Sequence, residues 1–228
     1  MIRKGLPEDA QDFANLVLLS EPNLFPAIFG SGAGNVFQNL FRQRRNLFSF
    51  EHSYFIEVGG KKAGMILGYD WKTQRWEEWR TGLLLIKYMK LEFPTKIPAL
   101  LKAMSVVGRV EDNEYYISNI AAYPEFRGAS LGTKLLLKTE EEAKSCGAEK
   151  IALDVDADNE DAIRLYNRLG YSIMGKLRRA KISSKDFAFF RCVKACDSKV
   201  DQFTHALPES KVIGEVVKQR GEARVIIK

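Results

Sequence analysis

The most informative part of this sequence is a glycine-bearing turn, Arg127-Gly128-Ala129-Ser130-Leu131-Gly132-Thr133. It follows an apolar run, Tyr115 to Ala122, that is predicted to be a strand, and it opens a helical pattern, Leu131 to Ser145. Glycines let the backbone turn tightly and expose consecutive amide N–H groups, and the helix N-terminus behind them adds partial positive charge. A pyrophosphate suits such a turn. Glycine turns before helices also occur without any ligand, so the turn alone leaves a purely structural role open.

The turn belongs to neither of the two commonest nucleotide-binding loops. A P-loop needs a lysine between its last glycine and the hydroxyl residue, whereas Thr133 directly follows Gly132. A dinucleotide fingerprint needs Gly-x-Gly-x-x-Gly, and residues 127–129 do not supply its first pair of glycines.

A second motif, Asn159-Glu160-Asp161-Ala162-Ile163-Arg164-Leu165-Tyr166-Asn167-Arg168-Leu169-Gly170-Tyr171, lies one strand further on. Ala162, Tyr166 and Leu169 share a helical face, and Gly170 suits the helix end. Taken alone, Tyr166 is better explained as an ordinary core or boundary tyrosine.

Together, in this order and spacing, the two motifs resemble those of the GNAT superfamily of N-acetyltransferases. The stretch Ile120-Ala121-Ala122-Tyr123-Pro124-Glu125-Phe126-Arg127-Gly128-x-x-Leu131-Gly132 is similar to the acyl-CoA-binding motif of that superfamily. The resemblance covers residues 115–194 well and residues 2–69 loosely. It departs from the family at Ala129-Ser130, where a further glycine or a basic residue is frequent.

The resemblance implies an α/β (α+β) acyl-CoA N-acyltransferase fold, with a mixed, mostly antiparallel central sheet and helices on both faces. We expect this domain to span residues 1–195 and residues 196–228 to be a C-terminal extension, with a β-hairpin over residues 212–228. Residues 71–108 are predicted to be an insertion between the third and fourth strands, made of two helices that are joined by a turn bearing Pro94 and Pro98. This insertion is expected to shape the acceptor pocket, and a packing or dimer role stays equally open. Residues 30–34, rich in glycine, are expected to be a flexible break.

The resemblance also assigns acetyl-CoA as the acyl donor and gives roles to individual positions. Ile120 and Ala122 offer backbone groups to the pantetheine arm, Asn159 binds that arm or an ordered water, and Tyr166 stands near the sulfur as a proton donor. The complete set of expected cofactor-binding residues is Ile120, Ala121, Ala122, Arg127, Gly128, Ala129, Ser130, Leu131, Gly132, Thr133, Asn159, Ala162 and Tyr166.

The family's reaction is direct attack of a neutral amine on the thioester, so a base that removes the amine's proton is useful. Glu114 begins the strand thirteen positions before Arg127, a placement that resembles the glutamate base of some family members. Asp154 and Asp156 on the next strand are alternatives, as is the absence of a dedicated base. The acceptor is expected to be a primary amine of a small molecule or a protein N-terminus. A non-catalytic acyl-CoA sensor on the same fold is the alternative function.

Composition and the absence of other motifs argue against several other classes of function. The net charge of +6 fits an anionic partner such as a polyphosphate cofactor, but no helix-turn-helix, zinc or RNA-recognition signature favours nucleic acid. No apolar run is long enough to span a membrane, and the start of the chain lacks the apolar core of a signal peptide, so a cytoplasmic protein without membrane association is predicted. Three cysteines form no disulfide framework, and no metal is expected. The sequence leaves open whether the protein forms a homodimer.

Overall fold

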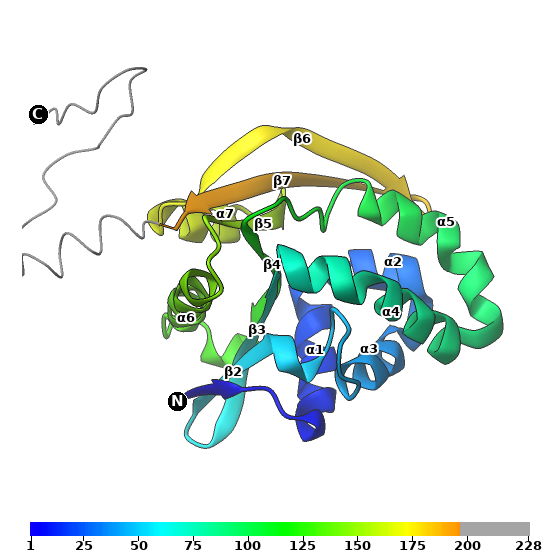
Figure 1. The fold of residues 1–228 in the computed structure, drawn as a ribbon, viewed down its shortest axis with the longest axis horizontal. Coiled ribbons are helices and arrows are strands. Elements are labelled where there is room, and N and C mark those ends of the chain that lie inside the picture. Colours follow the sequence, from blue (N-terminus) through cyan, green and yellow to red (C-terminus); the bar gives the residue numbers. More distant parts are fainter. Residues whose placement is uncertain (197–228) are drawn as a thin grey trace, which may run out of the picture. The chain divides into compact units, whose positions relative to one another are not determined.

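The centre of the protein is one seven-stranded sheet in the order β1-β2-β3-β4-β5-β7-β6 (Figure 1). The computed structural model describes residues 1–196. Among these residues, β4 and β5 form the one parallel pair, and every other neighbouring pair is antiparallel. The predicted mixed, mostly antiparallel sheet is therefore confirmed. The strands are β1 (Ile2–Lys4), β2 (Ser53–Val58), β3 (Lys61–Asp70), β4 (Glu114–Ala122), β5 (Lys150–Asp156), β6 (Ser172–Ile182) and β7 (Lys185–Ala195).

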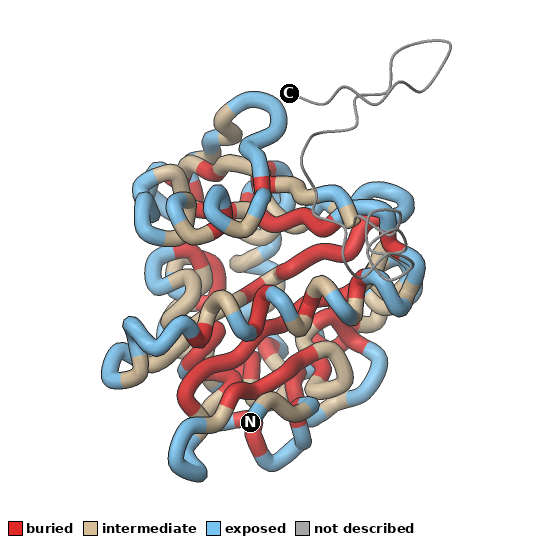
Figure 2. Tube along the Cα trace, turned by 90° about the vertical axis from the view of Figure 1, so that its left-hand side faces the viewer, coloured by how far each residue is buried: buried red, intermediate tan, exposed pale blue. Residues whose placement is uncertain are grey.

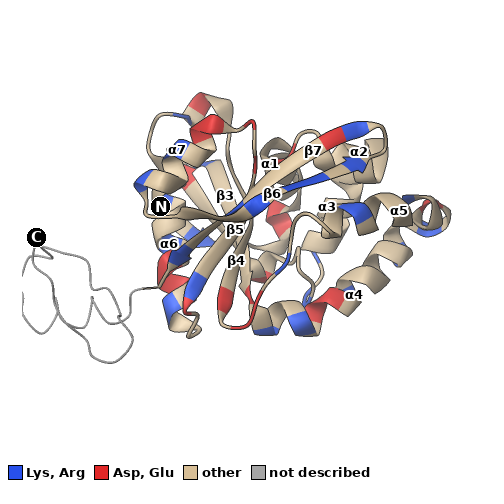
Figure 3. Ribbon diagram, turned by 90° about the horizontal axis from the view of Figure 1, so that it is seen from above, with Lys and Arg blue, Asp and Glu red and all other residues tan. Residues whose placement is uncertain are grey.

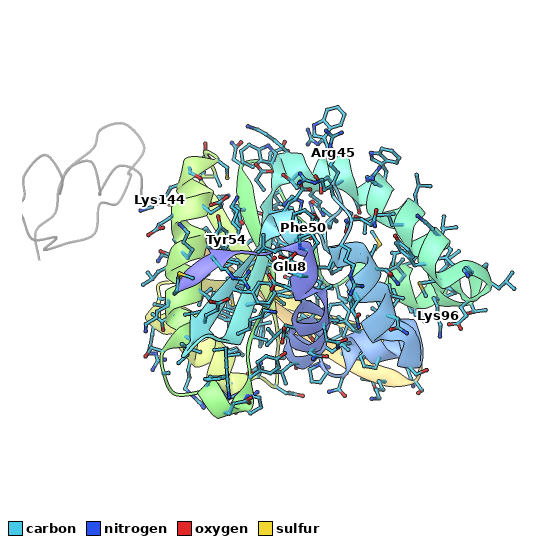
Figure 4. The ribbon with its side chains drawn as sticks, turned by 90° about the horizontal axis from the view of Figure 1, so that it is seen from below. Glu8, Arg45, Phe50, Tyr54, Lys96 and Lys144 are labelled. Atoms are coloured by element: carbon cyan, nitrogen blue, oxygen red, sulfur yellow. The ribbon has the colours of Figure 1, made fainter. Side chains whose placement is uncertain are left out.

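Helices cover both faces of this sheet. They are α1 (Ala10–Ser20), α2 (Leu24–Phe29), α3 (Ala33–Phe41), α4 (Trp71–Met89), α5 (Phe93–Met104), α6 (Leu131–Ser145) and α7 (Glu160–Arg168). Figure 1 shows α6 and α7 on one side of the sheet and α1 to α5 on the other. In Figure 4, Lys144 on α6 and Lys96 on α5 lie at opposite sides of the view, with Tyr54 of the sheet between them.

Each helical layer has its own core because side chains alternate between the two faces of a strand. Phe55, Met65 and Leu67 pack with α1 to α5. Their strand neighbours Tyr54 and Ile66 pack instead with α6 and α7. The buried residues accordingly run through the strands in Figure 2, while the outer faces of the helices are exposed.

The insertion between β3 and β4 consists of two helices, as predicted, but the prolines do not form the turn between them. Asp70 starts α4 by accepting a hydrogen bond from the backbone N–H of Thr73 (2.7 Å). The turn is a 3-10 segment, Lys90–Glu92. Pro94 lies in the first turn of α5, where a backbone N–H would have no intrahelical partner in any case. Pro98 lies inside that helix.

Helical structure near the N-terminus corrects one expectation and adds one unpredicted element. Residues 30–34 are not a break, because Gly30–Gly32 is a 3-10 turn that leads directly into α3. The short helix α2 was not predicted, and its Leu24, Ile28 and Phe29 are buried. The predicted hairpin over residues 212–228 lies outside the described residues.

Charge is spread over the described part of the chain. Figure 3 shows Lys and Arg on β6, α4, α5 and α6, interspersed with acidic residues. Within residues 1–196, no helix combines the length and apolarity needed to cross a bilayer.

Candidate active site

A gap opens in the sheet where β4 and β5 diverge. The two strands pair from Glu114 with Lys150 to Ile117 with Leu153, and within residues 1–196 no further pair joins them although both strands continue. The register of β4 against β3 shifts at the same level, between the partners of Leu67 and Gly68. This bulge bends β4 just where its pairing with β5 ends.

Two predicted backbone positions face this gap. The N–H of Tyr123 donates to the carbonyl of Ala63 on β3 (2.9 Å). Because successive N–H groups of a strand point to opposite edges, the N–H of Ala121 also faces β3, and those of Ile120 and Ala122 face the gap. A ligand that lies along β4 can therefore bond to Ile120 and Ala122 as an added strand would.

The glycine turn lies at the end of β4 and at the start of α6. Gly128 has φ +81°, a backbone conformation that favours glycine, and a Cβ built there would meet no atom of the described residues within 4 Å. Ser130, the residue before α6, is left-handed at φ +55° and makes no side-chain cap. The first amides of α6, at Leu131 to Thr133, therefore lack a side-chain partner from Ser130 and suit an anionic ligand.

The second motif closes a small cavity inside the gap, which we call the slot (about 80 Å³). Asn159 begins α7 by accepting a hydrogen bond from the N–H of Ala162 (3.2 Å). Tyr166 is buried on the same helix, and this burial raises its hydroxyl pKa. A neutral phenol at this position can donate a proton. The slot is lined by Ser20, Glu21, Ile117, Ser118, Asn119, Ile120, Leu153, Asp154, Val155, Asp156, Asn159, Ala162 and Tyr166.

A larger cavity of about 500 Å³, which we call the chamber, lies beside the slot. Residues of α2, α4 and α5 form about half of its wall, so the insertion contributes to this cavity. That the cavity receives the acceptor stays a prediction. Four residues line both cavities: Glu21, Ser118, Asn119 and Asp154. The slot and the chamber therefore share one wall.

Sequence reasoning missed three residues of this shared wall, Glu21, Ser118 and Asn119, and Glu21 is the ionisable one among them. It ends α1, and burial, followed by the charges of Asp156 and Asp154, raises its carboxyl pKa to about 8. Within residues 1–196 its side chain has no hydrogen-bond or ion-pair partner. An acid at a helix C-terminus opposes the helix dipole, and this was the signal in the sequence that could have pointed to it.

The two alternative bases lie at the gap, but both carboxylates accept hydrogen bonds from the protein. Asp154 accepts from the N–H of Gly108 (2.8 Å) and the hydroxyl of Tyr116 (2.9 Å), and it pairs with Arg178. Asp156 accepts from the N–H of Asp158 (2.9 Å).

Glu114, the first candidate base, lies away from both cavities. It is 2% exposed at the start of β4, the strand end opposite to the gap. It accepts from the N–H of Glu111 (2.9 Å) and forms an ion pair with Arg191. The structure thus brings together Tyr166, Asn159, Asp154 and Asp156 but not Glu114.

The glycine turn, the open edge of β4 and the two adjoining cavities agree with the acyltransferase class that the sequence predicts. Residues 24–171 match the acetyltransferase (GNAT) family, and the chain belongs to this family. The family predicted from the sequence is confirmed.

Relatives of known sequence and structure support this assignment. The chain is 35% identical to N-alpha-acetyltransferase 30 of Schizosaccharomyces pombe over 71 residues, 31% of this chain and 47% of that protein. It is 29% identical to an uncharacterised N-acetyltransferase of Methanocaldococcus jannaschii, over 60% of this chain and 65% of that protein. The chain thus spans less than two thirds of these curated relatives. The crystal structure of an N-acetyltransferase from Staphylococcus aureus superposes with a TM-score of 0.65 and 26% identity, covering 85% of this chain and all of that one.

Proposed function

We propose that the protein transfers an acetyl group from acetyl-CoA to a primary amine by direct attack. The observation that supports this proposal is the shared wall, where the slot lined by Tyr166 meets the chamber beside Glu21, a carboxyl without a partner in residues 1–196. Membership of the GNAT family supports the same reaction.

The residues expected to hold acetyl-CoA fit that ligand. The turn from Arg127 to Thr133 offers amides and open space for the pyrophosphate. Ile120 and Ala122 offer N–H groups to the pantetheine arm, and Asn159 and Ala162 close the slot over it. The thioester then lies near Tyr166.

Glu21 is our candidate for the base. Its carboxylate accepts a proton from the ammonium of the acceptor, whose reference pKa is about 10.4 for a lysine-like amine. The free amine attacks the thioester carbon, so the C–N bond forms and the C–S bond breaks. Tyr166 donates its proton to the departing sulfur, and the second proton of the amine nitrogen returns to the tyrosine through water. Glu21 finally releases one proton to solvent.

The acceptor class has two candidates. The name of the S. pombe relative favours a protein N-terminus, and that match covers only 31% of this chain. The mostly apolar lining of the chamber and its volume of about 500 Å³ favour a small molecule. The alternative function, a non-catalytic sensor on the same fold, is tested by the same assay as the reaction.

Replacing Tyr166 with Phe tests the reaction, because this change keeps the ring and its packing but removes the proton donor. Thiol release from acetyl-CoA with an amine panel is expected to fall about 10²–10⁴-fold, the usual range for a positioned acid. Calorimetry should show acetyl-CoA binding close to that of the parent. Turnover equal to that of the parent makes Tyr166 a packing residue. Absence of thiol release in the parent, with acetyl-CoA bound, supports the sensor.

A further inference from the structure

The lining of the chamber changes from polar to apolar along helix α4. The face of α4 that lines it carries Gln74, Glu78, Thr81, Gly82 and Leu85, in that order, so this wall passes from polar to apolar within three turns. The walls from α2 and α5 are apolar throughout: Phe25, Ile28, Phe29, Leu100, Ala103 and Met104. A molecule filling this chamber meets hydrocarbon over most of its surface.

The acidic groups lie at two separate places. Glu21 and Asp154 stand on the wall shared with the slot, and Asp154 is compensated by Arg178. Glu78 and Arg109 are both exposed and mark an outer part of the lining. Glu21 is therefore the uncompensated acid on the shared wall within residues 1–196, and it faces the cavity where the thioester is expected.

Helix α2, which lines the chamber, is held in place by its neighbours. Helix α2 contacts both α5 and β6. The hydroxyl of Ser183, in the turn between β6 and β7, donates to the carbonyl of Ala27 on α2 (2.8 Å). These contacts close α2 against its neighbours, and the volume of about 500 Å³ lies in the range of small-molecule sites.

We infer that the acceptor is a small primary amine carried on an apolar body, either alkyl or aryl, whose ammonium is received by Glu21 and whose body fills the space between α2, α4 and α5. This inference rests on the proposed function, since it names the substrate class of the same site. Burial of the body supplies binding energy, and burial of a second charge would oppose it.

A matched set of amines tests the substrate class with the full-length chain. The set comprises butylamine, hexylamine and octylamine, then 1,6-diaminohexane and 6-aminohexanoate, 2-phenylethylamine, and a peptide with a free N-terminus. We measure kcat/KM by thiol release from acetyl-CoA. We expect kcat/KM to rise about fourfold for each added methylene in the alkyl series. Hexylamine should exceed both of its polar-ended analogues, and the peptide, by about tenfold or more.

Gly82 offers a variant that fills the chamber without disturbing the fold. A Cβ built on this residue meets no atom within 4 Å, and leucine is a better helix former than glycine. Gly82→Leu should raise the KM of octylamine and 2-phenylethylamine about tenfold or more while the Kd of acetyl-CoA is unchanged. Leu83→Ala, on the exposed face of the same helix, is the control and should leave both constants unchanged.

The outcomes separate this inference from the proposed function. A diamine, an amino acid or a peptide that is acetylated better than hexylamine overturns the substrate class and leaves the acetyl transfer intact. The same holds for a KM of octylamine that Gly82→Leu does not change. If no amine or peptide releases thiol although acetyl-CoA binds, the proposed function fails, and the inference fails with it.

Discussion

Glu21 is a buried acid with a proposed chemical role, so its replacement should lower activity and raise stability. The folded protein raises its carboxyl pKa from 4.5 to about 8, chiefly by burial. Between these values the folded state binds the proton that the unfolded state has released, so stability falls as pH rises from about 4.5 to about 8 and stays low above it.

Glu21→Gln removes this pH-dependent penalty. The variant should melt at the same temperature as the parent near pH 4, and above pH 8 it should be more stable by about 3–5 kcal/mol. Its kcat/KM for an amine should nevertheless fall. Thermal melts at the two pH values measure the first effect, with Glu78→Gln, an exposed acid of the same chamber, as the control. A stability difference that does not grow with pH contradicts this account of Glu21.

Glu114 and Arg191 form a buried ion pair, and their replacement should affect stability rather than proton transfer. Glu114→Gln leaves Arg191, whose side chain is 13% exposed, without its closest partner. Breaking such a pair costs up to about 3–5 kcal/mol. Denaturant unfolding should show this loss, and the double variant Glu114→Gln, Arg191→Met should regain part of it. The shape of the pH–rate profile should not change. A rate defect that is rescued at high pH, without loss of stability, would restore Glu114 as the base.

At the scale of elements, the turn before α6 is expected to bind acetyl-CoA, and the other end of this helix supplies a matched control. Gly128 and Gly147 both have positive φ (+81° and +79°) and open space around a built Cβ. Replacing either with Asp imposes the same backbone strain, but only at Gly128 does the new carboxylate oppose the phosphates. Calorimetry should show weaker acetyl-CoA binding for Gly128→Asp and parent-like binding for Gly147→Asp. Equal affinity in both variants contradicts the phosphate site.

The elements that sequence predicts well are those whose signals are local. The glycine turn, the helical face of Tyr166 and the strands around them were found because turn residues and periodicity act over a few neighbours. Helix α2 was missed because six residues with a central proline, Pro26, carry little helical signal, and α2 is held by tertiary packing.

The residues that sequence cannot place are those defined by contacts over long separations. Glu114 was favoured from its spacing to Arg127, but its partner Arg191 comes from β7, and only the sheet brings them together. Glu21 reaches the site because α1 ends beside the divergence of β4 and β5, a placement that no spacing rule expresses.

At the scale of the whole domain, the sheet is divided at β4 and β5. In the described part of the chain, four residue pairs join the two halves, from Glu114 with Lys150 to Ile117 with Leu153. A ligand lying in the gap along β4 would complete the sheet, so its binding should protect particular backbone amides rather than the domain in general.

Hydrogen exchange with and without acetyl-CoA tests this directly. The N–H groups of Ile120 and Ala122 face the gap, whereas those of Ala121 and Tyr123 face β3. If exchange at the first pair requires ligand release, acetyl-CoA at 100 times its Kd should slow it by about 100-fold. The second pair, already bonded within the sheet, serves as the internal control and should change much less. Equal slowing at all four positions would indicate general stabilisation, and no slowing at Ile120 and Ala122 would mean that the ligand does not lie along β4.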